Sequence, residues 1–390
     1  MCYWKMFNKL KETIGEENMS QNEADKAAYS SDASRIRGKA DTIIWPKTLE
    51  DVRQAISYAK RHNLNVVPRG AGTGLAGGAV PQDSIVLDMC RMDRFAVQKD
   101  RAIVEPGVIL DNLNSESDYI LPVIPGSHAV CTIGGMIATN AAGMRAFKYG
   151  KMADWIDELH VIDGTGKMIK VQGEKINHFC GWEGSTGIVV RARLKLIKLP
   201  TLRTMTVLRF DSITPMVERL KGLDTSHVSA LEYVDKYCSN LIGLGDMNHL
   251  IVEYESEEGE IKDEKELKKI WEKRDSLYAI ISAKGYTVAE DPQVPLEHID
   301  KLLYWLQKND IPTFGHIGIG VIHPHFKKDT SQRLVEEMFT VVKKINGSVT
   351  GEHGVGLLKK PYLEDAYKKK IKELKETYDP SNVLNRGKII

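Results

Sequence analysis

The sequence has no surplus of charge of one sign, no long apolar run and no paired cysteines, and each absence excludes a class of protein. The 54 basic side chains are nearly balanced by 53 acidic ones, and a formal net charge of +1 excludes the broad basic surface of a nucleic-acid-binding protein. No stretch approaches the roughly eighteen uninterrupted apolar residues of a membrane-spanning helix, and the first residues contain no apolar signal core. We therefore expect a cytoplasmic protein with no nucleic-acid partner and no membrane span.

The five cysteines are scattered along the chain and form no Cys-x-x-Cys pair. They are Cys2, Cys90, Cys131, Cys180 and Cys238. An odd number at such spacing predicts neither a disulfide framework nor an iron–sulfur cluster or zinc ribbon. Any iron–sulfur centre that exchanges electrons with this protein must therefore belong to another subunit.

The pattern of apolar residues predicts an α+β protein, and the length of 390 residues predicts two or three domains. Residues 41–46 have the pattern of a strand, residues 48–63 that of a helix with Thr48 as its N-cap, and residues 64–70 that of a second strand. A region of different character begins at residue 201. Near the C-terminus the chain is mostly helical.

A glycine-rich stretch, VVPRGAGTGLAGGAV (residues 66–80), follows the second of these strands and contains five glycines. Glycine permits positive φ and lets the backbone touch a ligand, so such a turn can form a nest of amides for a diphosphate. The stretch has no Gly-Lys-Ser/Thr and no long following helix, which excludes a P-loop and a Rossmann fingerprint. A glycine-rich surface turn is the plain alternative.

A second stretch of small residues, PGSHAVCTIGGMIATNAAGMRAFKYG (residues 125–150), makes the surface turn the weaker interpretation. Together with GWEGSTGIV (residues 181–189), the two stretches resemble the PCMH-type FAD-binding domain of the vanillyl-alcohol oxidase superfamily. They are most similar to its D-lactate dehydrogenase and glycolate oxidase branch. The resemblance extends from about residue 40 to the C-terminus.

The resemblance implies a domain plan and a set of cofactor-binding residues. The plan is an N-terminal helical segment (1–38), a two-subdomain FAD-binding domain (39–200), a reduced α+β substrate cap with a metal-ligand loop (201–345), and a C-terminal helical segment returning to the flavin (346–390). The implied FAD residues are Pro68, Arg69, Gly70, Ala71, Gly72, Thr73, Gly74, Leu75, Gly78, Pro125, Gly126, Thr132, Gly134, Gly135, Thr139, Asn140, Ala141, Gly143, Gly187 and Ile188. The terminal YDPSNVLNRGK, similar to a family motif, adds Asn385 near the flavin ring.

The stretch GHIGIGVIH places His316 and His323 seven residues apart. On a straight strand they would lie about 23 Å apart on opposite faces. On a helix they would stand about 10 Å apart, so neither arrangement lets them share a metal ion. A reversal at Gly318 and Gly320 would bring the two imidazoles together, and a carboxylate would be the expected third ligand.

Glu352 in TGEHGVG offers that carboxylate, with His353 beside it. The resemblance implies that His316, His323 and Glu352 hold a divalent metal, Zn or Mn, and that His353 is the catalytic base. It also implies that Arg274, in IWEKRDSLY, binds the substrate carboxylate; a solvent-exposed arginine on a charged helix is the alternative. The expected reaction is FAD-dependent oxidation of a D-2-hydroxyacid, of D-lactate or glycolate type, to the 2-oxoacid by proton abstraction and hydride transfer to flavin N5.

The sequence departs from the family pattern at five positions near these motifs. Ile319 and Val321 stand where the family usually has Asp and Asn, and His325 where some relatives have asparagine. Tyr278 and Ala289 replace the threonine and lysine of hydroxyglutarate-specific relatives, which favours a small monocarboxylate. The region before residue 315 is also shorter than the usual cap.

Two further functions stay open from the sequence. One is a flavin enzyme without metal that acts on another alcohol, such as a sugar acid or a glycerol derivative. The other is a non-catalytic FAD subunit of a redox complex. The expected partners are a small 2-hydroxyacid substrate and an iron–sulfur or other electron-acceptor subunit, and self-association into a homo-oligomer is left open.

Overall fold

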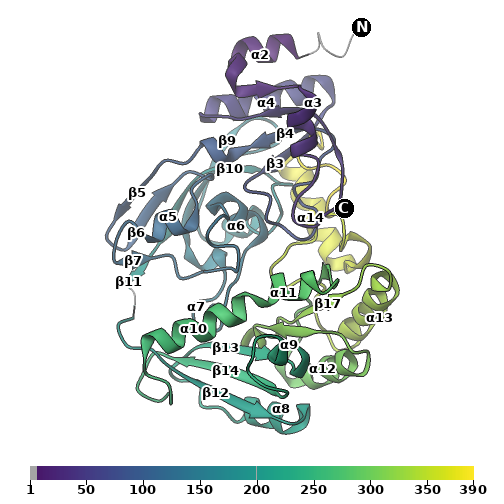
Figure 1. Ribbon diagram of the computed structural model, residues 1–390. Coiled ribbons are helices and arrows are strands. Elements are labelled where there is room, and N and C mark those ends of the chain that lie inside the picture. The colour runs from purple at the N-terminus through teal and green to yellow at the C-terminus, as the bar shows by residue number, and fades with distance from the viewer. Residues whose placement is uncertain (1–6, 199) are drawn as a thin grey trace.

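The computed structural model describes residues 7–198 and 200–390, so Cys2 and the first six residues of the expected N-terminal segment lie outside the described part. Figure 1 shows the first half of the chain, in purple to teal, above a body built around a sheet in teal and green. The C-terminal helix, in yellow, returns beside the first half (Figure 1). The expected boundaries at residues 38, 200 and 345 stay predictions.

The first sheet contains the predicted strand–helix–strand unit. Its strand order is β1-β2-β4-β3, with β2, β4 and β3 parallel. The elements are β1 (Met19–Ser20), α3 (Glu23–Ala28), β2 (Lys39–Ile44), α4 (Leu49–His62), β3 (Asn65–Arg69) and β4 (Gln82–Asp88). Thr48 caps α4 in a capping box with Asp51, as its sequence position predicts. The N-terminal helix α2 (Asn8–Ile14) is docked on α4, where Phe7 packs on Tyr58.

The second sheet is antiparallel and completes the first half of the chain. Its strand order is β5-β6-β10-β8-β9. The strands are β5 (Phe95–Gln98), β6 (Arg101–Val104), β8 (Ile156–Ile162), β9 (Met168–Val171) and β10 (Ile188–Lys195), and a short pair joins β7 (Tyr119–Ile120) to β11 (Ile197–Lys198). The helices are α5 (Leu110–Asn114), α6 (Ile133–Thr139) and α7 (Ala146–Tyr149). Apolar side chains of α5, α6 and the sheet form one core that holds the second stretch of small residues in place.

The third sheet has strand order β12-β14-β13-β16-β17-β15 and is covered on both faces. Its strands are β12 (Thr204–Phe210), β13 (Val228–Val234), β14 (Asn248–Tyr254), β15 (Val288–Ala289), β16 (Thr313–Gly315) and β17 (His323–Phe326). Its helices are α8 (Ile213–Lys221), α9 (Lys236–Leu241), α10 (Glu264–Asp275), α11 (Leu277–Ala283), α12 (Ile299–Lys308) and α13 (Ser331–Lys344). Alternate residues of β13 face opposite cores, Leu231 toward α8, α12 and α13, and Ala230 toward α9, α10 and α11.

The C-terminal segment returns to the first sheet through α14 (Asp365–Tyr378). The backbone of Val66 in β3 donates to Val383 and accepts from Asn385, so the chain end lies along this strand. Lys375 in α14 donates to the carbonyl oxygens of Ser185 and Leu384, which fixes the helix against the same region. Within the described ranges, no helix is long and apolar enough to cross a membrane.

Candidate active site

A cavity of about 520 Å³ lies between the glycine-rich loops and the histidine-bearing strands. One wall comes from residues 68–79, 125–141 and 183–189 of the first half of the chain. The other wall is formed by side chains of the third sheet, of α10 and α11, and of the loop over residues 350–356, called the later loop below. These are Arg274, Asp275, Tyr278, Ala279, Ala289, Phe314, His316, His323, His325, Glu352 and His353. Motifs that are far apart in the sequence therefore face a single space.

Most of the residues expected at a cofactor line this cavity. They are Pro68, Arg69, Gly70, Ala71, Gly72, Thr73, Gly74, Leu75, Gly78, Pro125, Gly126, Thr132, Gly134, Gly135, Thr139, Ala141, Gly187 and Ile188. The two glycine-rich stretches touch, because a Cβ on Gly70 would lie 2.2 Å from Oγ1 of Thr132.

Two glycines of this wall leave space toward the cavity. A Cβ on Gly74 or Gly126 would meet no described protein atom within 4 Å, although both residues line the cavity. Gly72 adopts φ +72, which side chains rarely allow, and turns the loop. Exposed backbone and missing side chains are what an extended diphosphate cofactor needs at close approach, so this wall fits FAD.

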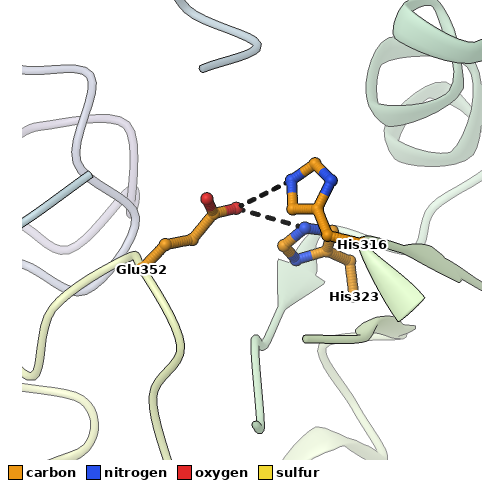
Figure 2. A group of neighbouring side chains, drawn as sticks. All are labelled: His316, His323 and Glu352. Carbon is orange, nitrogen blue, oxygen red and sulfur yellow. Dashed lines mark ion pairs between the residues drawn. The ribbon is translucent and has the colours of Figure 1, made fainter. Parts of the chain in front are cut away.

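Figure 2 shows His316 and His323 pointing toward Glu352. Oε1 of Glu352 lies 3.5 Å from Nε2 of His316 and 3.2 Å from Nε2 of His323. One ligand atom from each side chain lies within 4.8 Å of the others, a spacing that one divalent cation could span. Two imidazoles and a carboxylate are also the donor set that Zn or Mn accepts.

A reversal of the chain brings the two histidines together, as their spacing predicts. Strands β16 and β17 are antiparallel neighbours, and a single 3-10 turn over Ile317–Ile319 begins the connection between them. Gly320 then takes φ +70, where a Cβ would lie 2.0 Å from the carbonyl oxygen of Val294. The imidazole rings end with centroids 5.1 Å apart.

Burial and mutual charge set the protonation of this cluster. Burial lowers the pKa of His323 to about 4, so its imidazole is neutral. Burial would raise the pKa of Glu352, but His316 and His323 outweigh it and hold that pKa well below its ordinary value. Burial lowers the pKa of His316, but the carboxylates of Glu232 and Glu352 outweigh burial and raise that pKa to about 9. A cation binds neutral imidazoles and an ionised carboxylate, so it would displace one proton from His316.

His353 lies beside the cluster on the same loop as Glu352. Its Nε2 is 3.7 Å from Oε1 of Glu352, and its ring stacks on His323 with centroids 5.2 Å apart. Burial lowers the pKa of His353, which keeps the imidazole neutral at pH 7 and able to accept a proton. The side chain lines the cavity on the wall that carries His316 and His323.

Arg274 is buried at the end of α10 and lines the cavity rather than facing solvent. Its guanidinium lies 4.9 Å from the centre of the Phe314 ring and pairs with Glu232 at 2.5 Å. The helical region that carries Arg274 is interrupted at Ser276, which separates α10 from α11. The break sets Asp275 and Tyr278 on the cavity wall with Arg274.

Comparison with known families places both halves of the chain in one family. Residues 40–172 match the FAD binding domain, and residues 248–389 match the C-terminal domain of FAD linked oxidases. The chain belongs to the FAD-linked oxidases. This confirms the family predicted from the glycine-rich stretches and makes the chain an FAD-linked oxidoreductase.

Three relatives of this FAD-linked oxidase are each 28% identical to it. Glycolate oxidase subunit GlcD of Bacillus subtilis aligns over 97% of this chain and 95% of that protein. D-2-hydroxyglutarate dehydrogenase of Stutzerimonas stutzeri aligns over 93% and 94%, and D-lactate dehydrogenase of Archaeoglobus fulgidus over 89% and 91%. A solved structure of alkyldihydroxyacetonephosphate synthase, 16% identical, covers 99% of this chain and 85% of its own with TM-score 0.70. That likeness confirms the α+β, PCMH-type fold.

Three residues expected at the cofactor of this FAD-linked oxidase lie behind the wall instead of on it. Asn140 has φ +50, and its Oδ1 accepts from the amide of Ala153. A Cβ on Gly143 would lie 2.2 Å from the carbonyl oxygen of Ile124. Asn385 donates through Nδ2 to the carbonyl oxygens of Gly78, at 3.1 Å, and Glu183, at 2.8 Å. Their contacts support the loops from outside the cavity.

Three buried carboxylates of the FAD-linked oxidase were missed by sequence reasoning. Glu183 accepts from the amides of Val355 and Gly356, and so fixes the later loop to the glycine-rich wall. Asp291 accepts from the amides of residues 351, 352 and 353, and so holds the loop that carries Glu352 and His353. Glu232 contacts Arg274 and His316 from β13. The available signal was a charged residue within an otherwise buried stretch, which requires a partner.

Proposed function

We propose that this FAD-linked oxidoreductase converts a D-2-hydroxyacid to its 2-oxoacid with the help of a divalent cation, Zn or Mn. The observation that carries the proposal is the cluster of His316, His323 and Glu352 in the same cavity as the glycine-rich wall. Arg274 and His353 border that cluster. An α-hydroxy acid offers a hydroxyl and a carboxylate side by side, which matches a cation beside an arginine.

The residues of this chain divide the work by their chemistry. Arg274 would hold the substrate carboxylate, because a guanidinium donates two parallel hydrogen bonds to that group. The neutral imidazole of His353 would take the hydroxyl proton. A cation held by His316, His323 and Glu352 would lower the pKa of a coordinated hydroxyl. Bound FAD supplies the acceptor for the two electrons that leave the substrate carbon.

The wall around Arg274 favours a monocarboxylate of D-lactate or glycolate type. Tyr278 and Ala289 line the cavity and carry no positive charge. Among the described lining residues the only arginines are Arg69, in the glycine-rich wall, and Arg274, and there is no lysine. A second substrate carboxylate would therefore be buried beside Arg274 without a cationic partner, which is unfavourable.

We also propose that the electrons leave to a separate acceptor subunit, such as an iron–sulfur protein. The described cysteines Cys90, Cys131, Cys180 and Cys238 are all free. A cluster needs several thiolates converging on one point, and the metal-ligand groupings of the described residues contain no cysteine. The acceptor would therefore be a second protein.

The test is anaerobic reduction of the purified yellow protein by a panel of substrates. D-lactate and glycolate should bleach the flavin absorbance, whereas L-lactate and D-2-hydroxyglutarate should bleach it poorly. A chelator should slow the bleaching by D-lactate, and added Zn²⁺ or Mn²⁺ should restore its rate. Bleaching by glycerol or a sugar acid that is insensitive to chelator would contradict the metal-assisted reaction. A protein that no alcohol bleaches would be a non-catalytic FAD subunit.

A further inference from the structure

Glu232 lies outside the cavity wall and is in contact with two groups that belong to it. The residue is on β13, its side chain has no exposed surface, and it is not among the residues that line the cavity. Oε1 lies 2.6 Å from Nδ1 of His316, while Oε2 lies 2.7 Å from Nε and 2.5 Å from Nη2 of Arg274. Each oxygen of one carboxylate therefore holds a different active-site side chain.

On the histidine side, this contact determines which nitrogen is free. An ionised carboxylate only accepts hydrogen bonds, so Nδ1 of His316 carries the proton that it donates to Glu232. Nε2 is the nitrogen that remains to face Glu352, which is 3.5 Å away, on the side where the cation would be held. A carboxylate behind a ligand histidine fixes its tautomer and ring orientation.

On the arginine side, the same carboxylate accepts from Nε and from one N–H of Nη2, which leaves Nη1 and the second N–H of Nη2 for a ligand. Asp275 is the other anion near the guanidinium, at 3.7 Å from Nη1. Nη2 of Arg274 and Nδ1 of His316 are only 3.5 Å apart, and both are donors toward Glu232. The shared carboxylate therefore holds two donor groups next to each other that would otherwise separate.

We propose that Glu232 is a positioning residue that couples the cation ligand His316 to the substrate clamp Arg274. This inference rests on the proposed function, because it assumes that a cation and a substrate carboxylate bind there. A cation at His316 fixes the imidazole against Glu232, and the carboxylate in turn holds the guanidinium for substrate. By linkage, substrate that orders Arg274 strengthens cation binding by the same factor.

The test measures cation affinity directly, without turnover. Full-length FAD-bound protein, stripped of metal, is titrated with Mn²⁺, and free Mn²⁺ is read by electron paramagnetic resonance. Glu232→Gln keeps the size of the side chain but offers one oxygen in place of two, so Mn²⁺ affinity should fall about ten- to a hundredfold. The KM for D-lactate should rise as well, because the clamp loses its support.

Glu253→Gln is the matched control. Glu253 lies on the neighbouring strand β14, is equally buried, and binds Arg145 through both oxygens at 2.6 and 3.0 Å. It does not line the cavity. Its variant should bind Mn²⁺ as the wild type does, so a loss confined to Glu232→Gln cannot come from removing any buried charge in this sheet.

Arg274→Lys provides a second test that leaves Glu232 in place. Lysine keeps the positive charge but cannot hold Glu232 through two nitrogens, so coupling predicts at least about fivefold weaker Mn²⁺ binding although residue 274 is no ligand. Unchanged Mn²⁺ affinity in this variant or in Glu232→Gln, with normal binding by the wild type, overturns the coupling alone. A wild-type protein that binds neither Mn²⁺ nor Zn²⁺ overturns the cation site and the coupling together.

Discussion

The two walls of the cavity recognise their ligands in opposite ways. The wall of the first half of the chain is made of backbone and small residues, and the space at Gly74 and Gly126 is what would admit a cofactor. The opposite wall carries several buried ionisable side chains, and one of them, His316, is held by the buried carboxylate of Glu232. Ligand binding at the first wall depends on the absence of side chains. Ligand binding at the second wall depends on charged side chains and on the charged groups that hold them. Substitutions should therefore affect the two walls differently.

The largest effect is expected at the charged wall, from His353→Ala. Loss of a positioned base typically lowers turnover by about 10²- to 10⁴-fold. The protein should stay yellow, because His353 lies on the wall opposite the glycine-rich loops. Steady-state turnover of D-lactate and flavin absorbance measure the two outcomes. His227→Ala, at an exposed histidine outside the cavity, is the control. Turnover by His353→Ala within tenfold of wild type would show that His353 is not the catalytic base.

The next effect is on stability, from Asp291→Ala. Asp291 has no exposed surface, accepts three amides of the later loop, and pairs with the buried Lys359. Its removal leaves three loop amides without their acceptor and leaves Lys359 with only the more distant Glu290, at 3.5 Å, which together should cost about 3–5 kcal/mol. Urea unfolding monitored by circular dichroism measures the loss.

Glu337→Ala is the control for Asp291→Ala. Glu337 forms a half-exposed pair with Arg333 on α13 at 3.5 Å. Exposed pairs of this kind contribute less than about 1 kcal/mol. Similar losses from the two variants would show that the buried charges of this wall are no more important for folding than those at the surface.

At the glycine-rich wall, which is the backbone wall of this comparison, Gly126→Val and Gly143→Ala should affect different properties. The first should weaken FAD binding and the second should lower folding stability. Gly126 lines the cavity, and a Cβ there meets no described protein atom within 4 Å, so the variant should fold normally and bind FAD at least about tenfold more weakly. A Cβ at Gly143 meets the carbonyl oxygen of Ile124 at 2.2 Å, so this variant should lose folding stability instead. FAD titration and urea unfolding of the FAD-free proteins distinguish them, and equal loss of both properties in both variants would contradict the distinction.

The two walls also differ in how far the sequence predicts them. Each glycine-rich stretch is continuous in the sequence, so it can be identified as a motif. The reversal between His316 and His323 follows from their spacing and from the glycines between them. The partner of His316 could not be found in this way, because Glu232 precedes it by 84 residues and meets it only across the strands of the third sheet. A charged residue in a wholly buried strand signals that a partner exists and gives no indication of which one.

Asn385 shows a related limit on the backbone side. The C-terminal motif predicts that the chain end returns to the FAD-binding domain, and it does return along β3. Whether its side chain faces the ligand or the protein depends on contacts with Gly78 and Glu183, which are made through space and not through the motif. A motif therefore locates a segment more reliably than it assigns the direction of a side chain.

The smallest predicted effect comes from Lys388, a buried charge that supports the backbone wall by donating to the carbonyl oxygen of Gly78 at 2.8 Å. Burial lowers the pKa of this amine to about 8, although Glu183 and Asp32 oppose the shift. Between about pH 8 and the ordinary value of 10.5 the unfolded chain binds more protons than the folded one, so stability contributed by this site rises with pH. The unfolding free energy of the wild type relative to Lys388→Met should thus increase by at most about 1.4 kcal/mol per pH unit above pH 8, and stay level below it. Urea unfolding at pH 7, 8, 9 and 9.5 measures this slope, with the exposed Lys344→Met as control. Parallel plots of unfolding free energy against pH for wild type and Lys388→Met would mean that Lys388 is as well solvated as a surface lysine. The backbone wall would then need no buried charge behind it.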